Sequence, residues 1–437
     1  MSTIKSSTTT TTAYSVEADT TGALVIQTGA TPTTAVTIGS DQSVTFAGAV
    51  SLSGNQTTTG NLTVNGNTTL GDANTDTILM TAAPSIGGAG LGMGMGFRNR
   101  ILNGSMVIDQ RNAGAAVTIN TNSTIYTLDR WFAFGQATDG VFTIQQAGTG
   151  LASLPNGIKV TVTTADASIG ATQSYLVGQY IEGFNFFDAN WGTANAKTVT
   201  LSFWVYSSVT GTFSGSLRNS AVNRSYPFTY TISSANTWEK KSVTIAGDTT
   251  GTWVGATNGI GVAVIFSLGG GSTLSGTAGA WAGANYTNAT GATNLISTLN
   301  AVFYITGVQL EVGSTATSFD YKPYGTELQL AQRYYFKNTG YLFSIHGSGT
   351  VFSSTLGDIY VKLPVSMRIS PTVNVSSCVL QTGAVSYAVT AVSGANGVTP
   401  DAAFVRCTTA GVMVAGNAGI LTNNNDASGF LEAVAEL

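Results

Sequence analysis

Charged residues are scarce in this sequence. Asp, Glu, Lys and Arg make up 9% of the 437 residues, well below the roughly 25% that is usual for soluble domains. The 17 basic residues form no stripe among the 21 acidic ones, so the electrostatic surface that nucleic-acid binding requires is missing. The longest apolar runs, such as residues 259–268, are too short to cross a bilayer and are typical of buried strands. The sequence therefore predicts neither nucleic-acid binding nor membrane insertion.

Histidine and cysteine are rarer still. One histidine, His346, and two cysteines, Cys378 and Cys407, leave little material for nucleophilic catalysis or for a metal site with His and Cys ligands. His346 stands in a strand-like run, where a surface or hydrogen-bonded side chain is the favoured interpretation. The cysteines, 29 positions apart, could pair, but two small buried apolar side chains are the better expectation.

Apolar and polar residues alternate in short runs that Gly, Asn, Ser and Thr interrupt. This pattern predicts strands that each bury one face, and hence an all-β chain. In residues 97–325 the expected strands, enough for two four- or five-stranded sheets of a β-sandwich, are Val117–Asn120, Arg130–Gln136, Val141–Gln146, Ile158–Thr164, Ser174–Ile181, Thr198–Tyr206, Tyr226–Ile232, Trp238–Ile245, Ile260–Leu268 and Phe303–Val312. One short linking helix is expected at residues 326–336, with Thr326 as its N-cap. Residues 337–437 return to strands and predict a C-terminal β-sandwich.

The N-terminal part carries an internal repeat. A Ser/Thr-rich segment at residues 1–13 is predicted to be a disordered tail or an attachment segment, and short strands begin after it. Glycines at positions 48, 54, 60 and 66 are six residues apart, and three of them precede Asn, which favours tight turns between short strands. One such unit buries too few side chains to fold alone and needs neighbours. We therefore predict a β-repeat shaft at residues 14–86 and a Gly-rich neck at 87–96; a small monomeric β-domain is the alternative.

Three motifs carry a resemblance to a known family. They are N-G-S-M-V-I-D-Q-R at residues 103–111, L-D-R-W at 128–131, and G-V-Q-L-E-V-G at 307–313, the last followed by F-D-Y-K-P-Y-G-T-E-L-Q-L-A-Q-R-Y-Y. Together they resemble the jelly-roll module of bacteriophage tail-fibre proteins, which is similar to carbohydrate-binding jelly rolls. The resemblance implies a jelly roll at residues 97–325 and, since the repeat region is similar to fibre shafts, a homotrimeric fibre. Structural calcium is common in related jelly rolls, although nothing in this sequence specifies its ligands.

A sugar-binding surface would expose aromatic rings, which stack on pyranose rings, beside polar side chains that bond the hydroxyls. Two Gly/Asn-rich loops carry such residues, and the candidate glycan-binding residues are Asn190, Trp191, Trp281 and Tyr286. Three other tryptophans occupy positions where family members keep core aromatics and are expected to be buried: Trp131, Trp204 and Trp238. Three acidic residues of the family pattern are expected to form structural ion pairs: Asp109, Asp129 and Glu311.

The resemblance, together with the six-residue glycine repeat, implies a structural phage fibre protein that recognises surface glycans of a host cell and adheres to them. Its partners would be two further copies of itself, other virion proteins through the N-terminal region, and a host polysaccharide or protein receptor. It would be made in the host cytoplasm and act outside the cell, on the virion. The alternatives are a passive virion fibre or decoration protein and a glycan depolymerase. Because the acidic residues are scattered and no close pair stands out, we predict no enzyme.

Overall fold

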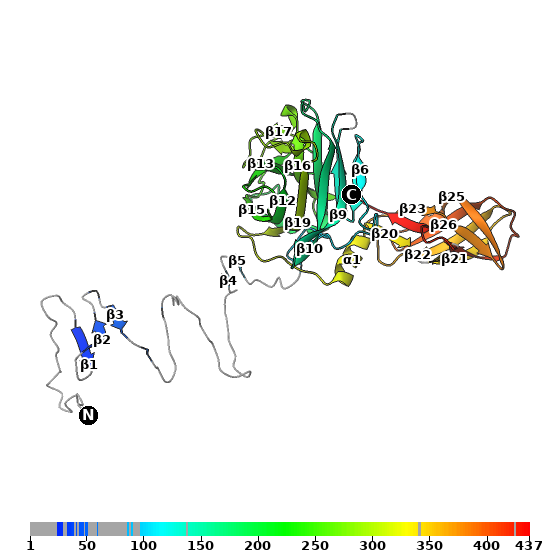
Figure 1. Cartoon of the computed structure of the whole chain (residues 1–437). Helices are drawn as coiled ribbons and strands as arrows, with labels where there is room; N and C mark the ends of the chain where they lie inside the picture. Colours follow the sequence, from blue (N-terminus) through cyan, green and yellow to red (C-terminus); the bar gives the residue numbers. More distant parts are fainter. Residues whose placement is uncertain are drawn as a thin grey trace, which may run out of the picture. The chain divides into compact units, whose positions relative to one another are not determined.

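The computed structural model describes residues 97–437 apart from 137–138, 340–341 and 424, and, before them, residues 24–28, 33–38, 41, 43–47, 49–50, 59, 85–86 and 89–90. The chain divides into two units, Met1–Leu79 and Met80–Leu437, and Figure 1 labels the strands described in each. The predicted tail at residues 1–13, the glycines of the six-residue repeat and residues 91–96 of the neck lie outside the described part. No helix in the described part is long and apolar enough to cross a membrane.

The first unit contains a small antiparallel sheet. Its strands, in spatial order, are β1 (Leu24–Thr28), β2 (Thr33–Ile38) and β3 (Val44–Phe46). The apolar side chains of Ile26, Val44 and Phe46 are 48%, 51% and 51% exposed. Among the described residues, much of the apolar surface of this sheet is therefore left uncovered. At the start of the second unit, β4 (Ser85–Ile86) pairs with β5 (Ala89–Gly90), which belongs to the predicted neck.

Two six-stranded antiparallel sheets form the large β-domain of the second unit. The β12 sheet contains, in spatial order, β15 (Glu239–Ile245), β12 (Val199–Ser207), β19 (Val302–Val312), β10 (Leu154–Thr164), β9 (Val141–Leu151) and β6 (Val117–Ile119). The β11 sheet contains β14 (Ser225–Ile232), β13 (Gly211–Arg218), β16 (Ile260–Gly270), β11 (Ser174–Glu182), β8 (Trp131–Phe134) and β7 (Ile125–Leu128). All ten predicted strands are present; β7 and β13 were not predicted, so the sheets are wider than expected.

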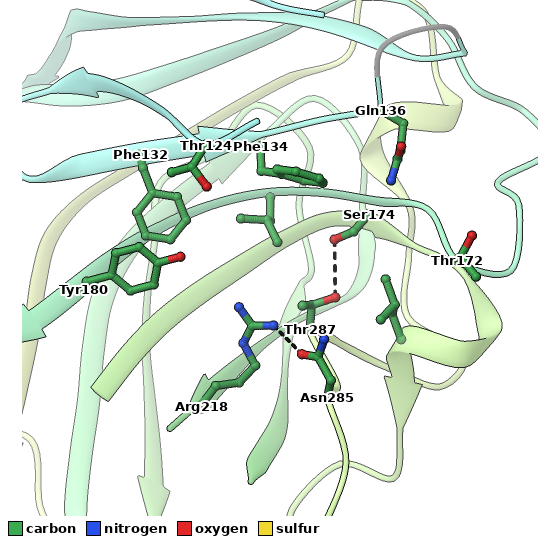
Figure 2. A pocket seen from close by; sticks show the side chains of 12 residues that line it. Thr124, Phe132, Phe134, Gln136, Thr172, Ser174, Tyr180, Arg218, Asn285 and Thr287 are labelled. Atoms are coloured by element: carbon green, nitrogen blue, oxygen red, sulfur yellow. Dashed lines mark hydrogen bonds between the residues drawn. The ribbon is translucent and has the colours of Figure 1, made fainter. Parts of the chain in front are cut away.

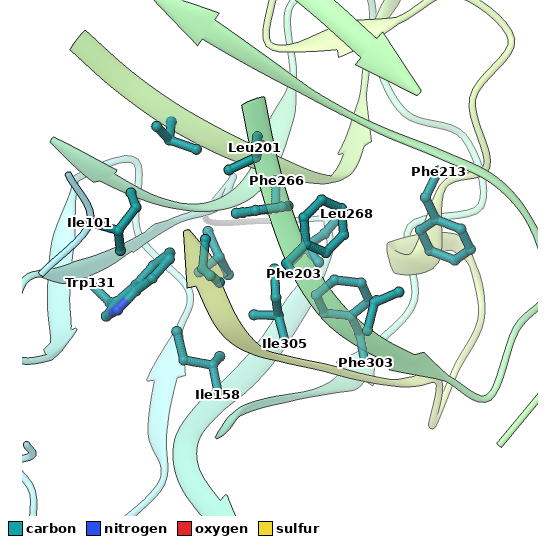
Figure 3. Packing of buried hydrophobic residues seen from close by; sticks show 14 of the residues in the cluster. Ile101, Trp131, Ile158, Leu201, Phe203, Phe213, Phe266, Leu268, Phe303 and Ile305 are labelled. Carbon is teal, nitrogen blue, oxygen red and sulfur yellow. The ribbon is translucent and has the colours of Figure 1, made fainter. Parts of the chain in front are cut away.

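Short elements connect these strands. They are the 3₁₀ turns η1 (Gly183–Asn185), η2 (Phe187–Ala189), η3 (Ser272–Leu274) and η4 (Leu295–Ser297) and the short parallel strands β17 (Ser275–Gly276) and β18 (Asn288–Ala289). The core lies between the sheets and is rich in aromatic side chains, among them Trp131, Phe203, Phe213, Phe266 and Phe303 (Figure 3). Phe203 contacts Phe266 edge to face, with ring centroids 5.0 Å apart, a favourable arrangement of ring quadrupoles. The two sheets therefore form the expected β-sandwich.

The three motifs of the resemblance meet in this sandwich. The side-chain amide of Asn103 donates to the carbonyl of Asp129, and the indole Nε1 of Trp131 donates to the carbonyl of Asn103, both at 3.0 Å. A Cβ on Gly104 would lie 2.3 Å from the carbonyl oxygen of Val308 in β19, so only glycine fits between the first motif and the last. The residues of the motifs therefore hold the two ends of the domain together through contacts with the backbone.

The linking helix begins and ends earlier than predicted. Helix α1 spans Tyr324–Gln332 with Pro323 at its N-cap, so Thr326 lies inside the helix and the predicted cap is wrong. Its Glu327 carboxylate accepts a hydrogen bond from the backbone amide of Asn103. Because this contact ties the first turn to the Asn-Gly motif, the helix is anchored from its N-terminal end. The last residues of the predicted helix belong to β20 (Tyr335–Thr339) instead.

The C-terminal region is all-β, as predicted, but one of its sheets closes on itself. A closed barrel is formed, in spatial order, by β21 (Ile345–Val351), β22 (Leu356–Lys362), β26 (Ala402–Thr409), β25 (Val385–Val398), β24 (Val379–Thr382) and β27 (Ala418–Thr422). Beside it, a three-stranded sheet has the order β20, β28 (Phe430–Val434), β23 (Thr372–Ser376). Closure pairs the two edge strands of the sheet.

The structure agrees with the prediction for the two cysteines and Trp131, but not for the histidine and the other two tryptophans. Cys378 and Cys407 are buried and free, as favoured. His346 is only 7% exposed, and neither ring nitrogen has a hydrogen-bond partner in the described structure; its expected surface or hydrogen-bonded setting is wrong, and burial lowers its pKa. Trp131 is fully buried as predicted. Trp204 and Trp238 are only partly buried, because they lie on the outer face of the β12 sheet, so the expectation of core positions is wrong for both.

Candidate functional site

A hollow of about 370 Å³ lies over the outer face of the β11 sheet. Alternation along β8 sends Trp131 and Ala133 into the core and leaves Phe132 and Phe134 on the opposite face, as strand geometry requires. The cavity is lined by Thr124, Phe132, Phe134, Gln136, Thr172, Ser174, Leu176, Tyr180, Arg218, Leu274, Asn285 and Thr287 (Figure 2). The site is therefore built from β8, β11 and β13, with one wall supplied by the segment that follows β16.

A stacked aromatic pair forms one side of the cavity. The rings of Phe132 and Tyr180 are 4.4 Å apart between centroids, with 24° between their planes. Phe132 is 1% exposed, so it supports Tyr180, whose own ring is only partly buried. A Cβ on Gly178 would lie 2.8 Å from Cζ of Phe132 and 2.7 Å from the carbonyl of Val264. This glycine therefore makes the space in which the Phe132 ring lies.

Hydroxyl and amide groups provide the polar lining. The hydroxyls of Ser174 and Thr287 lie 3.3 Å apart, and Gln136 and Thr172 also line the cavity (Figure 2). The wall that carries Thr287 is held by the parallel pairing of β17 with β18. Such groups can both donate and accept hydrogen bonds, which suits a ligand rich in hydroxyls.

Arg218, the last residue of β13, supplies the positive charge of the cavity. Its Nη1 donates to the side-chain oxygen of Asn285, and burial lowers its pKa from the usual value. None of the twelve lining residues is acidic. The cavity thus combines an aromatic ring, neutral polar groups and one cation.

The predicted loop residues lie elsewhere. Trp191 is 6% exposed, so the expectation that its ring is exposed is wrong. Its ring centroid lies 5.0 Å from that of Trp281 and 4.8 Å from that of Trp253, edge to face in both cases. The structure therefore brings two predicted residues from distant loops together, in an aromatic cluster that packs against the core and not in the cavity.

The other two candidates are more open. Asn190 is exposed and has a left-handed backbone at the end of η2. Tyr286 is partly buried, and its ring packs so closely over Gly276 that a Cβ there would lie 2.2 Å from Cδ2 of the tyrosine. Its neighbour Asn285 lines the cavity, so one predicted loop borders the site although its named residues do not line it.

A smaller hollow of about 150 Å³ lies on the outer face of the β12 sheet. Tyr206, Trp238 and Tyr304 line it, with Trp238 5.7 Å from Tyr206 and 5.9 Å from Tyr304 between ring centroids. The indole Nε1 of Trp238 donates to the carbonyl of Thr149 at 3.0 Å, which fixes the ring. This second aromatic surface is a natural control for the first.

The acidic residues of the family pattern make hydrogen bonds rather than the predicted ion pairs. Asp109 accepts backbone N–H groups of its own turn, Asp129 accepts from Gln110, and Glu311 accepts from Thr317. The described ion pairs include none of the three acids. In the described part, no three His, Cys, Asp or Glu side chains gather to hold a metal ion.

No protein-family model and no curated protein sequence matches this chain. Among solved structures, it is similar to a protein of Bacteroides thetaiotaomicron VPI-5482 named for sugar binding (16% identity, 49% of this chain and 100% of that one, TM-score 0.29). It is also similar to the enzymatically active domain of tailspike protein 4 of bacteriophage CBA120 (12% identity, 50% and 22%, TM-score 0.26). A third is the family 11 carbohydrate-binding module of Clostridium thermocellum in complex with a β-1,3-1,4-mixed-linked tetrasaccharide (10% identity, 47% and 100%, TM-score 0.24). At such identities and TM-scores, these likenesses decide neither the ligand nor the activity.

Proposed function

We propose that the cavity over the β11 sheet binds a saccharide, and that the chain is a structural fibre protein of a bacteriophage that attaches the virion to host surface glycans. The observation that carries the binding proposal is the partly open ring of Tyr180, supported by Phe132 and placed beside hydroxyl and amide groups. A sugar ring has an apolar face that stacks on such a ring and hydroxyls that bond such groups.

The fibre role is supported by the sequence and by the first unit. The motifs at residues 103–111, 128–131 and 307–313 resemble a tail-fibre module, and the exposed apolar side chains of the β1–β3 sheet call for neighbouring chains. Three copies of the chain would place three identical cavities on one fibre. Weak sites held together in this way gain affinity through effective concentration.

Binding without hydrolysis is the favoured activity of the cavity. Glycoside hydrolysis uses two carboxyl groups that flank the bond to be broken, and the lining residues contain none. If the chain were a depolymerase, the purified protein would release reducing sugar from the polysaccharide. A passive fibre would bind no saccharide and would not compete with virions for host cells.

The direct test is retention of full-length protein on an array of bacterial surface polysaccharides and their oligosaccharides. Tyr180→Ala is expected to weaken binding about tenfold or more, because it removes a central anchor of the site. Trp238→Ala on the β12 sheet is the matched control and is expected to bind as the wild type does. Loss of binding in the control alone would move the site to the second hollow, and a wild type that retains no saccharide would refute the proposal.

A further inference from the structure

Arg218 differs from the other arginines of this chain. Of the nine, six pair with a carboxylate: Arg100, Arg111, Arg130, Arg224, Arg333 and Arg406. Arg368 donates to three backbone carbonyls, and Arg98 is exposed to solvent. Arg218 is partly buried, and in the described structure it has neither a carboxylate nor a backbone carbonyl partner; its acceptor is the side-chain amide oxygen of Asn285. Partial burial of a cation without a counter-charge costs free energy, so the position of Arg218 in the cavity requires an explanation.

The geometry leaves one edge of this guanidinium available. Nη1 donates to Asn285, and Nε is closed off without a hydrogen-bond partner. Nη2 donates to no protein acceptor among the described contacts, and it is not among the closed-off atoms. The Nη1–Nη2 edge therefore faces the cavity, where Tyr180 and Arg218 point into the same hollow (Figure 2). A planar carboxylate matches this edge with two parallel N–H···O bonds.

We infer that the cavity selects saccharides that carry a carboxylate, such as hexuronic or nonulosonic acids, with the carboxylate on Arg218 and the sugar ring on Tyr180. This inference rests on the proposed saccharide site and narrows its ligand. The ligand's carboxylate would supply the counter-charge that Arg218 lacks. Because none of the lining residues is acidic, no carboxylate of the lining competes with the ligand for the guanidinium. The hydroxyls of Ser174 and Thr287 lie in the same cavity and can bond the remaining ring substituents.

The test uses full-length protein and matched pairs of ligands in calorimetric titrations. Oligosaccharides of galacturonic, glucuronic and N-acetylneuraminic acid are each compared with their methyl esters, which keep the shape and lose the charge. In at least one pair the acid is expected to bind about ten- to a hundredfold tighter than its ester, the usual range for a charge-assisted hydrogen bond. The preference is expected to shrink as salt is added, since exposed charges are screened.

Two variants assign the effect to Arg218. Arg218→Gln is expected to remove the preference for the acid, so that the acid and its ester bind with similar affinity. Asn285→Asp is expected to do the same, because it places a carboxylate of the protein on the guanidinium while adding an ion pair that preserves the fold. Arg98→Gln removes the same charge outside the cavity and is expected to keep the preference. Thermal unfolding of each variant separates loss of binding from loss of structure.

The outcomes distinguish the two proposals. If esters and acids bind equally in every pair, and Tyr180→Ala still abolishes binding, the saccharide site stands and the selection by charge is refuted. Tighter binding of a sulfated galactan than of any carboxylate would likewise refute the choice of carboxylate. If the wild type binds none of these ligands or their neutral counterparts, the saccharide site itself fails.

Discussion

The last residues of the chain should contribute strongly to its stability, and Glu436 is where this can be measured. Its carboxylate pairs with Arg111 at 2.9 Å and also with Arg130. The exposed side-chain fractions are 5% for Glu436 and 1% for Arg130. The guanidinium of Arg130 also lies 3.6 Å from the ring centroid of Tyr334. A residue just after β28 therefore supplies the counter-charge for two arginines that belong to the first two sequence motifs.

The size of the effect follows from burial. Removing one partner of a buried ion pair costs about 3–5 kcal/mol, since the other charge stays buried and uncompensated. In Glu436→Gln the amide oxygen still accepts from one arginine, so the expected loss is about 3 kcal/mol, at the low end of that range. Asp188→Asn is the control, because the pair of Asp188 with Arg100 is also short, at 2.6 Å, but 38% and 23% exposed. Its expected loss is about 1 kcal/mol or less.

The assay is urea unfolding at pH 7, followed by tryptophan fluorescence, for the wild type and both variants. A lower midpoint at unchanged slope reports a loss of stability. If Glu436→Gln loses no more than Asp188→Asn does, the buried pair is not what fixes the C-terminal end, and the account of this contact is wrong.

Three further predictions concern pH, packing and assembly. Burial raises the pKa of Asp129 to about 6, above its ordinary value of 3.8, so this group favours folding below pH 4 and the benefit is lost as the pH rises through 6. Asp129→Asn should therefore remove about 2 kcal/mol of the pH dependence that chemical unfolding shows between about pH 4 and pH 7. Equal pH dependence in both proteins would contradict this. Gly104→Ala should lower the free energy of unfolding by about 3 kcal/mol, because its Cβ would meet the carbonyl of Val308. In the control Gly148→Ala nothing lies within 4 Å of the new Cβ, so the loss should be under about 1 kcal/mol. Similar losses in the two variants would refute the steric argument. Light scattering of the full-length protein should give three times its 44.7 kDa mass, and a monomer would end the shaft proposal.

The sequence predicted the strands well wherever apolar residues alternated or ran together, as in β12 and β19. It missed β13 because Gly and Ser interrupt that strand. The structure explains their presence, since a Cβ on Gly215 would lie 2.4 Å from Cζ of Phe228 and 2.2 Å from a backbone oxygen of β16. Small residues there serve the packing of neighbouring strands, which local propensity does not register.

The candidate site was harder to predict, because its parts meet only in the fold. Trp191 stands in a turn-rich stretch, yet Trp253 and Trp281 enclose it. Trp204 lies between two core-facing residues in an uninterrupted apolar run, so the sequence alone did not show which face it takes. Arg218 and Asn285 are 67 positions apart. The alternation in W-F-A-F at residues 131–134 was the available signal, since a buried Trp131 places Phe132 on the opposite face.

The most direct test of the account is a crystal structure of the full-length chain with the tightest-binding acidic oligosaccharide. We predict a sugar ring on Tyr180, with its carboxylate on the Nη1–Nη2 edge of Arg218 and its hydroxyls toward Ser174 and Thr287. A sugar bound at Trp238 on the β12 sheet, or at Trp281 in the aromatic cluster, would contradict it.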